Sequence, residues 1–316
     1  MPVALERADA AHLLSGLKDC PAVGIALSGG ADSTALLWLC AQFPGPAFQS
    51  FIVDHGLRAQ SAAEAEAAAA TSRALGIPAL ILRWQGEKPA SGLQAAARAA
   101  RYGLMAEAAK AAGIGVILTA HQSDDVAETF LMRLARGSGL DGLAAIPAET
   151  VMAGVRILRP LLAVPHESLV ATLRRENISW CEDPSNHAER FERARLRRQM
   201  AELLPGLGLA PDKITLAATR LARARAALEA ATDRLMAEAV EADGSIREDA
   251  FLAQPAELRL RLLSRLIPGE MAQLERLAEL LAAGQGDGFT LGGRQIRRRG
   301  GRIGILPERG RANSPL

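Results

Sequence analysis

The chain has 316 residues, of which 49% are hydrophobic and 23% are charged, and its formal net charge is +2. This length suits two domains, and this composition predicts a soluble protein with a sizeable core. A charge-free stretch at 33–53 is interrupted by Pro44, Gly45 and Pro46, which excludes a membrane span there.

The three cysteines, Cys20, Cys40 and Cys181, are scattered and form no C-x-x-C pair. This pattern indicates a reducing compartment and argues against structural disulfides, zinc and iron–sulfur clusters. Residues 1–20 mix charged and apolar positions, so no signal peptide is expected and a cytoplasmic location is predicted.

Strand-like and helix-like segments alternate through the first half of the chain. A leading amphipathic helix is predicted at 5–17, and strands at 22–27, 49–53, 79–82, 115–118 and 152–158. Helices are predicted between them at 31–42, 61–75 and 93–112, and after the last strand at 166–174. This alternation predicts an α/β fold with a doubly wound parallel sheet, whose ligands bind beyond the carboxyl ends of the strands.

The first strand ends in a tight turn made by six residues: Ser28, Gly29, Gly30, Ala31, Asp32 and Ser33. Two glycines allow a sharp turn and a close approach to a ligand, and the amides that open the next helix favour an anion. A carboxylate beside a phosphate indicates a divalent cation between them. The common phosphate loop does not fit, because no lysine lies between Lys18 and Lys88.

Polar residues also follow two other strands. Asp54 and His55 follow the second strand, and His121 follows the fourth. A helix is predicted to start with Ser123 as its N-cap, with Asp125 and Glu128 on one face. We expect His121, Asp125 and Glu128 to converge on the phosphate turn; the alternative is that the acids only complement the helix dipole.

The second half of the chain is mostly helical, after a domain boundary predicted at 203–208. Helices are predicted at 213–240, 256–266 and 271–282, followed by a small β-hairpin unit within 289–306. Two arginine clusters stand out. The first contains Arg190, Arg193, Arg195, Arg197 and Arg198, and the second contains Arg294, Arg297, Arg298, Arg299 and Arg302. Clustered arginine favours nucleic-acid binding, although each cluster alone could also be a solvated or helix-pairing face.

The turn at 28–33 resembles the SGGxDS signature of the PP-loop ATP pyrophosphatases. Within that superfamily, four further stretches are similar to motifs of the tRNA(Ile)-lysidine synthetases. They are VDHGLR at 53–58, ARxxRY at 97–102, HxxDDxxET at 121–129 and RGSGLxGL at 136–143. The family's RNxxR pattern is only partly matched, because Ala194 replaces its asparagine.

The resemblance implies a PP-loop catalytic domain at 1–207 and a smaller helical and β tRNA-binding domain at 208–316. It implies ATP-dependent attachment of free L-lysine to C2 of the wobble cytidine in an isoleucine tRNA with a CAU anticodon. Asp32, His121, Asp125, Glu128 and Arg193 would be catalytic, with Asp32 and Asp125 as Mg²⁺ ligands. ATP would be bound by Ser28, Gly29, Gly30, Ala31, Asp32, Ser33, Asp54 and His55, and tRNA by Arg190, Arg193, Arg195 and Arg197.

Two other functions compete with ligation. A PP-loop tRNA sulfurtransferase would need a thiolate near the nucleotide, and neither Cys20 nor Cys40 is well placed for that role. A non-catalytic ATP-binding regulator would tolerate the loss of His121, Asp125 and Glu128, yet all three are present. The sequence does not fix the oligomeric state, and a homodimer stays open.

Overall fold

The computed structural model of the protein describes residues 3–57, 60–86, 88–89, 91–181, 206 and 209–308. The chain divides into two compact units, Met1–Ala222 and Arg223–Leu316. Each unit is described by itself. The arginine cluster at 190–198 lies outside the described residues, as does most of the predicted boundary at 203–208.

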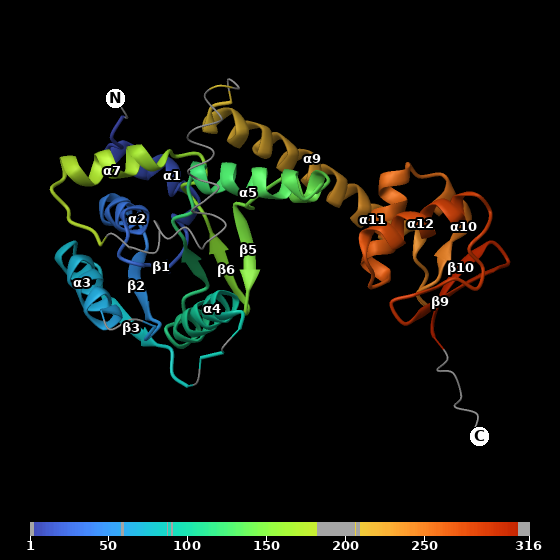
Figure 1. Ribbon diagram of the computed structural model, residues 1–316, viewed down its shortest axis with the longest axis horizontal. Coiled ribbons are helices and arrows are strands. Elements are labelled where there is room, and N and C mark those ends of the chain that lie inside the picture. Colours follow the sequence, from blue (N-terminus) through green and yellow to red (C-terminus); the bar gives the residue numbers. More distant parts are fainter. Residues whose placement is uncertain are drawn as a thin grey trace. The chain divides into compact units, whose positions relative to one another are not determined.

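Unit 1 is built on a six-stranded sheet with the order β3-β2-β1-β4-β6-β5 (Figure 1). Its strands are β1 (Ala22–Ala26), β2 (Ala47–Asp54), β3 (Ala79–Arg83), β4 (Val116–Leu118), β5 (Glu149–Met152) and β6 (Val155–Leu158). All neighbouring strands are parallel except β5, which pairs antiparallel with β6 at one edge. Gly24 of β1 pairs with Ile117 of β4, so these two strands end side by side. The predicted α/β fold with a parallel sheet is confirmed.

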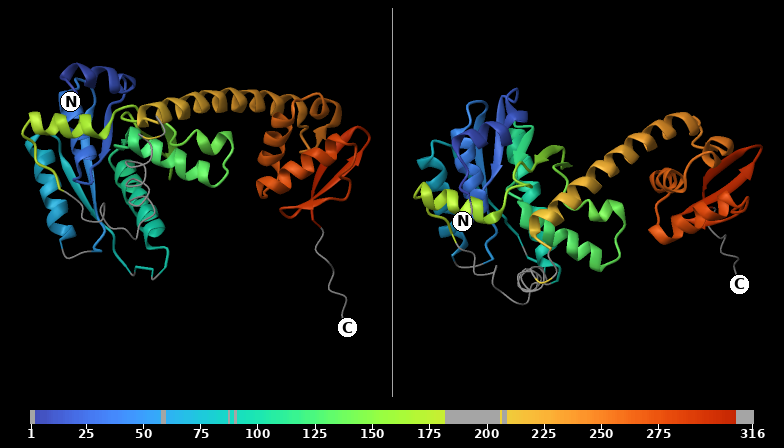
Figure 2. Two further views of the ribbon diagram at one scale, coloured as in Figure 1. Left: turned by 45° about the horizontal axis from the view of Figure 1, so that its top comes forward. Right: turned by 90° about the horizontal axis from the view of Figure 1, so that it is seen from above.

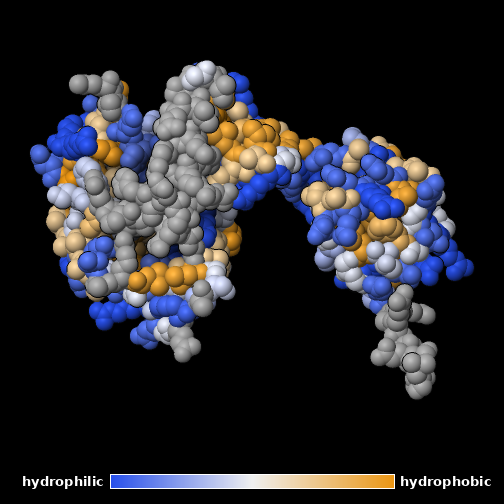
Figure 3. Space-filling view, in the orientation of Figure 1, coloured by the Kyte–Doolittle hydropathy of each residue, from blue (hydrophilic) through white to orange (hydrophobic). Residues whose placement is uncertain are grey.

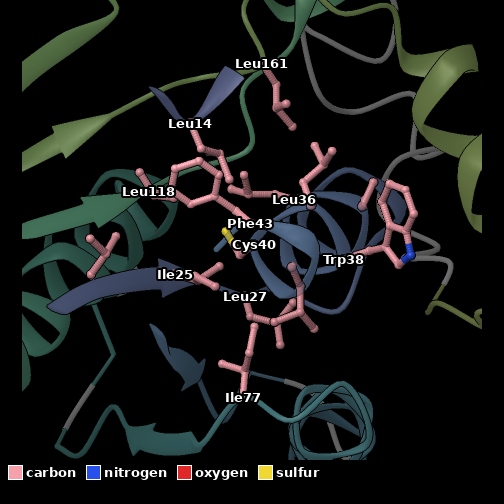
Figure 4. Close-up of a cluster of buried hydrophobic side chains, with 14 of the residues drawn as sticks. Leu14, Ile25, Leu27, Leu36, Trp38, Cys40, Phe43, Ile77, Leu118 and Leu161 are labelled. Carbon is pink, nitrogen blue, oxygen red and sulfur yellow. The ribbon is translucent and has the colours of Figure 1, made fainter. Parts of the chain in front are cut away.

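Helices cover both faces of this sheet. They are α1 (Arg7–Leu13), α2 (Ala31–Gln42), α3 (Ser61–Ala74), α4 (Leu93–Ala111), α5 (Ser123–Ala135), α6 (Leu140–Leu143) and α7 (His166–Arg175), with a 3-10 turn η1 (Ser15–Leu17). One core joins the sheet to α1, α2, α3 and α7, and Figure 4 shows part of it around Leu36 and Phe43. A second core lies against α4 and includes Phe51, Tyr102 and Met105. The predicted leading helix at 5–17 is shorter than expected, because α1 ends at Leu13 and η1 follows.

The single strand expected at 152–158 is wrong, because the structure forms a hairpin of β5 and β6 there. Ala153 and Gly154 both have positive φ angles, 49° and 79°, as in the two-residue turns that join twisted antiparallel strands. Val155 and Ile157 of β6 are buried, whereas Val151 of β5 is exposed at the sheet edge. The prediction failed because the alternation of apolar residues continues across the turn at Ala153 and Gly154. In addition, Ala-Gly is a weaker turn signal than Asn-Gly.

Unit 2 combines helices with a four-stranded antiparallel sheet of order β7-β10-β9-β8. The helix α9 (Pro211–Ala239) runs without a break from unit 1 into unit 2 (Figure 2). The other elements are β7 (Ile246–Arg247), α10 (Glu248–Leu252), α11 (Ala256–Leu266), α12 (Met271–Ala282), β8 (Thr290–Leu291), β9 (Arg294–Arg299) and β10 (Arg302–Pro307). Their core contains Leu235, Phe251, Leu263, Leu277 and Ile296.

The small β-hairpin unit expected within 289–306 is present, but it contains the additional strand β9 between β8 and β10, and β7 joins it, so the sheet is larger than predicted. The arginines of the second cluster lie on these two strands, and several meet acids. Arg298 pairs with Glu248, and the Arg297–Asp287 and Arg302–Asp243 pairs are 3.9 and 4.0 Å apart. Figure 3 shows a largely hydrophilic visible face on this unit. Among the described residues, no helix has the length and apolar character needed to cross a membrane.

Candidate active site

The turn between β1 and α2 is a preformed anion cradle. Gly29 has a φ of +84°, which favours glycine, and a Cβ placed on it would also lie only 3.3 Å from Cβ of Ala68. Gly30 is the N-cap of α2 and has no side chain to occupy the first amides of the helix. Those amides and the positive end of the helix dipole favour a phosphate at this position.

Ser33 holds the turn in shape from inside. Its Oγ accepts a hydrogen bond from the amide of Ser28 at 3.2 Å, lies 3.0 Å from Oγ of Ser28, and donates to the carbonyl of Gly30 at 3.0 Å. Ser33 is buried. From the sequence, Ser33 was predicted to donate a hydrogen bond to a phosphate. The structure adds a second role, because its hydrogen bonds within the turn fix the shape of the turn before any ligand binds.

Asp32 is paired with His166, which belongs to none of the predicted motifs. Nδ1 of His166, the first residue of α7, lies 2.7 Å from Oδ1 of Asp32. Both side chains are partly exposed, 43% for His166 and 29% for Asp32. Because α2 and α7 pack together in the core beneath, the histidine is held beside the phosphate turn.

Asp54 and His55 lie at the end of β2, next to the end of β1. Oδ1 of Asp54 accepts hydrogen bonds from Oγ of Ser61 at 2.7 Å and from the amide of Gly56 at 2.9 Å. These bonds, the first above all, lower the pKa of Asp54. Burial lowers the pKa of His55, with a further contribution from the charge of Arg101, so its neutral form is favoured. Asp54 therefore shapes the loop that follows β2, and His55 is an uncharged ring beside it.

Polar residues also follow β4, as predicted. Nδ1 of His121 lies 3.0 Å from Oγ1 of Thr119. The N-cap of α5 is Gln122 and not Ser123: its side chain accepts from the amide of Asp124 at 2.5 Å, and Asp125 accepts from the amide of Gln122 at 3.1 Å. Asp125 thus completes a capping box at the start of α5. This is a structural role at the helix start, like the interaction with the helix dipole that was the alternative to a catalytic role.

Glu128 lies one turn further along α5 and is almost completely buried, at 1% exposure. Because β1 and β4 are parallel neighbours, α2 and α5 begin at the same edge of the sheet. Within the part of the chain that the structure describes, no three His, Cys, Asp or Glu side chains are grouped to hold one metal ion. The expected convergence of His121, Asp125 and Glu128 on the phosphate turn stays a prediction.

The structure also places Cys181 against the phosphate turn. The amide of Cys181 donates to the carbonyl of Gly29 at 2.9 Å, and its Sγ lies 3.8 Å from the position of a Cβ on Gly29. Cys40 is buried within α2, and burial raises its pKa strongly. Sequence distance alone could not reveal that Cys181 returns to the turn. Arg190, Arg193, Arg195 and Arg197 lie outside the described residues.

Comparisons with known proteins identify the family of this chain. The family model of the PP-loop domain matches residues 6–204. A tRNA(Ile)-lysidine synthase of Rhodopseudomonas palustris is 44% identical over 296 residues, which cover 88% of this chain and 85% of the relative. The enzyme of the same name from Bradyrhizobium diazoefficiens is 42% identical, with 95% and 93% coverage.

Among solved structures, the U34-tRNA thiolase NcsA from Methanococcus maripaludis aligns with a TM-score of 0.58 and 18% identity. The alignment covers 69% of this chain and 77% of the thiolase. At that identity the likeness concerns the fold alone. The match to the PP-loop model and the identity to the curated relatives show that this chain belongs to the tRNA(Ile)-lysidine synthase family and carries its ATP-binding PP-loop domain.

Proposed function

We propose that this protein is a tRNA(Ile)-lysidine synthetase that acts in the cytoplasm. It ligates free L-lysine to C2 of the wobble cytidine in an isoleucine tRNA with a CAU anticodon, and releases AMP and pyrophosphate. The observation that carries the proposal is 44% identity to a curated relative over 88% of the chain, together with an anion cradle at the end of β1.

The chemistry explains why ATP is needed. C2 of cytosine is a urea-like carbonyl carbon, and its oxygen is a poor leaving group. Attack of that oxygen on the α-phosphate of ATP breaks the bond to the β-phosphate and releases pyrophosphate. The oxygen then leaves as part of AMP when an amine of lysine attacks C2, and the amine gives up a proton. The protein must therefore hold the triphosphate, present the base and accept a proton.

The turn from Ser28 to Ser33 is assigned to the phosphates. Gly29 and Gly30 leave the amides of this turn uncovered by side chains, and the hydrogen bonds of Ser33 fix the shape of the turn. Ala31 contributes its backbone as the first residue of α2. Asp54 and His55 are assigned to the nucleoside side of ATP, because β2 lies beside β1.

Asp32 and Asp125 are assigned to Mg²⁺. Mg²⁺ is usually bound through one or two carboxylates together with substrate phosphates and water, so two acids at helix starts on one sheet edge fit it. A carboxylate with one oxygen held by a histidine can still offer its other oxygen to a cation, which suits Asp32. When bound, the cation would offset the charge of the leaving pyrophosphate.

The remaining roles concern protons and RNA. His121 is assigned to proton transfer, because it follows β4 at the same edge. Glu128 and Arg193 are proposed as further catalytic residues. Arg190, Arg195 and Arg197, together with unit 2 and the exposed arginines Arg220 and Arg223 of α9, are proposed to hold tRNA phosphates.

One assay tests this function. Purified protein is given ATP and an isoleucine tRNA transcript with a CAU anticodon, and tRNA-dependent pyrophosphate release and incorporation of labelled lysine are measured. A methionine tRNA with the same anticodon is the matched control. Incorporation into the isoleucine tRNA alone is expected. Pyrophosphate release with sulfur incorporation and without lysine would instead identify a sulfurtransferase.

A further inference from the structure

An aromatic side chain outside the assigned site lies beside His55. The ladder between β2 and β3 continues one residue past the end of β3, because the amide of Trp84 donates to the carbonyl of Asp54 at 2.9 Å. The rings of Trp84 and His55 meet edge to face, with centroids 6.2 Å apart and planes at 90°. Strand alternation places both on the face of Val53 and Leu82, which pack into the core beneath α4.

Cations lie beside Trp84 and His55. Nζ of Lys88 lies 4.0 Å from the centroid of the Trp84 ring and donates to the Trp84 carbonyl at 2.6 Å. The positive charges of Arg101 and Lys88 also act on His55, against the negative charge of Asp54. Trp84 is half-buried, so part of its surface stays open to solvent. A partly exposed aromatic ring beside a cation is typical of a surface that stacks bases and neutralises phosphates.

The position relative to the phosphate turn is also suitable. Trp84 follows β3, and the turn follows β1, two strands away in the sheet order. With strands spaced about 4.8 Å apart, this separation is about 10 Å. A nucleotide whose phosphates lie in the turn can therefore reach Trp84 with its base, and so can a base that is brought toward those phosphates.

We propose that Trp84, His55 and Lys88 form a nucleobase-stacking site at the carboxyl ends of β2 and β3. The base stacks on the indole, and the ammonium of Lys88 moves from the ring to a phosphate of the same ligand. Two sources share this chemistry: the adenine of ATP, and the extruded cytosine of the RNA. The second source rests on the proposed function, whereas the first does not.

The test uses the full chain and binding measurements that need no catalysis. Wild type, Trp84→Leu and Trp84→Phe are titrated with ATP without RNA, and separately with an anticodon stem-loop without ATP. A stem-loop that lacks only the wobble base is the matched control ligand. Tryptophan fluorescence is recorded in the same titrations as the Kd. Trp38 and Trp180 are present in every variant, so fluorescence quenching that is seen in the wild type and absent in Trp84→Leu comes from Trp84.

Removal of the ring should weaken binding of the stacking ligand by about 5- to 150-fold, the range for loss of one base–aromatic stack. Trp84→Phe should bind the stacking ligand with most of the wild-type affinity. This result would show that the position tolerates substitution by another aromatic residue. Weakened ATP binding identifies adenine as the stacked base. Weakened binding of the intact stem-loop, with no change for the one that lacks the base, identifies cytosine.

The proposal is overturned if Trp84→Leu binds ATP and the intact stem-loop as the wild type does, with an unchanged circular dichroism spectrum. It is also overturned if both stem-loops lose affinity equally, because Trp84 would then contact the RNA backbone. Lysine incorporation by the wild type is measured in parallel. Its absence would refute the proposed function and leave the ATP arm of this test intact.

Discussion

His166 and Asp32 are 134 positions apart in the chain, yet Nδ1 of the histidine lies 2.7 Å from Oδ1 of the aspartate. The histidine begins α7 and the aspartate lies in the first turn of α2, and these two helices share a core. Asp32 is therefore held from outside the phosphate turn. A carboxylate that is oriented before its ligand arrives loses less conformational freedom on binding.

The first prediction concerns this contact. His166→Ala should weaken ATP binding in the presence of Mg²⁺ by about two- to tenfold, which corresponds to the loss of one hydrogen bond at a partly exposed site. His166→Asn should restore part of the affinity, because its amide nitrogen can take the place of Nδ1. Calorimetric titration with ATP measures both variants. Equal Kd values for alanine, asparagine and wild type would show that the contact does not position Asp32.

The second prediction separates the charge of Asp32 from its geometry. Asp32→Asn keeps an oxygen that can accept from His166, but it removes the charge that a divalent cation needs. We expect pyrophosphate release to fall by about a hundredfold or more, with little change in circular dichroism. The Mg²⁺ concentration for half-maximal activity should rise. An unchanged Mg²⁺ dependence would contradict the assignment of Asp32 as a metal ligand.

Most of the fold, and the part of the site carried by local turns, could be predicted from the sequence. The residues around Gly29 and Gly30 were placed correctly because a strand, a glycine turn and a helix are encoded within a few positions. The strand β9 was missed because only Ile296 of its residues 294–299 is fully buried and four of the six are arginines. Three consecutive arginines, Arg297, Arg298 and Arg299, hide the alternation of a strand.

The contacts that the sequence could not predict join distant segments. Nothing local marks His166 as a partner of Asp32, or Cys181 as a neighbour of Gly29. Ser123 was taken as the N-cap of α5 because serine is favoured there, but the reciprocal bonds of Gln122 and Asp125 place the cap one residue earlier. Competition between two adjacent polar residues is decided by backbone geometry.

The third prediction tests whether Asp125 does more than cap its helix. Asp125→Asn keeps an oxygen that can accept from the amide of Gln122, so the fold and tRNA affinity should be preserved. Loss of the charge beside the phosphates should reduce tRNA-dependent pyrophosphate release by about tenfold or more. Asp124→Asn, next to it in the same turn, is the matched control for the helix dipole. Equal losses in the two variants would leave the dipole as the common cause.

The fourth prediction concerns Cys181, which lies against the phosphate turn without belonging to any cysteine pair. If the protein ligates lysine, its thiol takes no part in the chemistry. Cys181→Ser should then keep lysidine formation within about twofold of the wild type, because the substitution preserves size and the backbone bond to Gly29. Complete loss of lysidine formation, with ATP binding retained, would show that the thiol takes part in the reaction.

The fifth prediction is about where the catalytic unit ends. The first turns of α9 pack on α5, the helix that carries Asp125 and Glu128. Ile214 contacts the cluster around Ala127, Ala218 contacts that around Val126, and Oγ1 of Thr215 donates to the carbonyl of Ser123 at 3.1 Å. A fragment of residues 1–208 lacks these groups and exposes the buried side of α5. A fragment of residues 1–222 keeps them, and its end coincides with the end of unit 1.

We therefore expect the 1–222 fragment to fold and to bind ATP, and to be more stable than the 1–208 fragment by about 3 kcal/mol, the value of one large buried side chain and one hydrogen bond. Urea unfolding of the two fragments measures the difference. Ile214→Ala in the 1–222 fragment is the internal control, because it removes the apolar contact and leaves the bond from Thr215. The stability of this variant should lie about midway between the stabilities of the two fragments. If the two fragments unfold at the same urea concentration, α9 stabilises α5 only in the intact chain, and the predicted boundary at 207/208 would then mark the end of the catalytic domain.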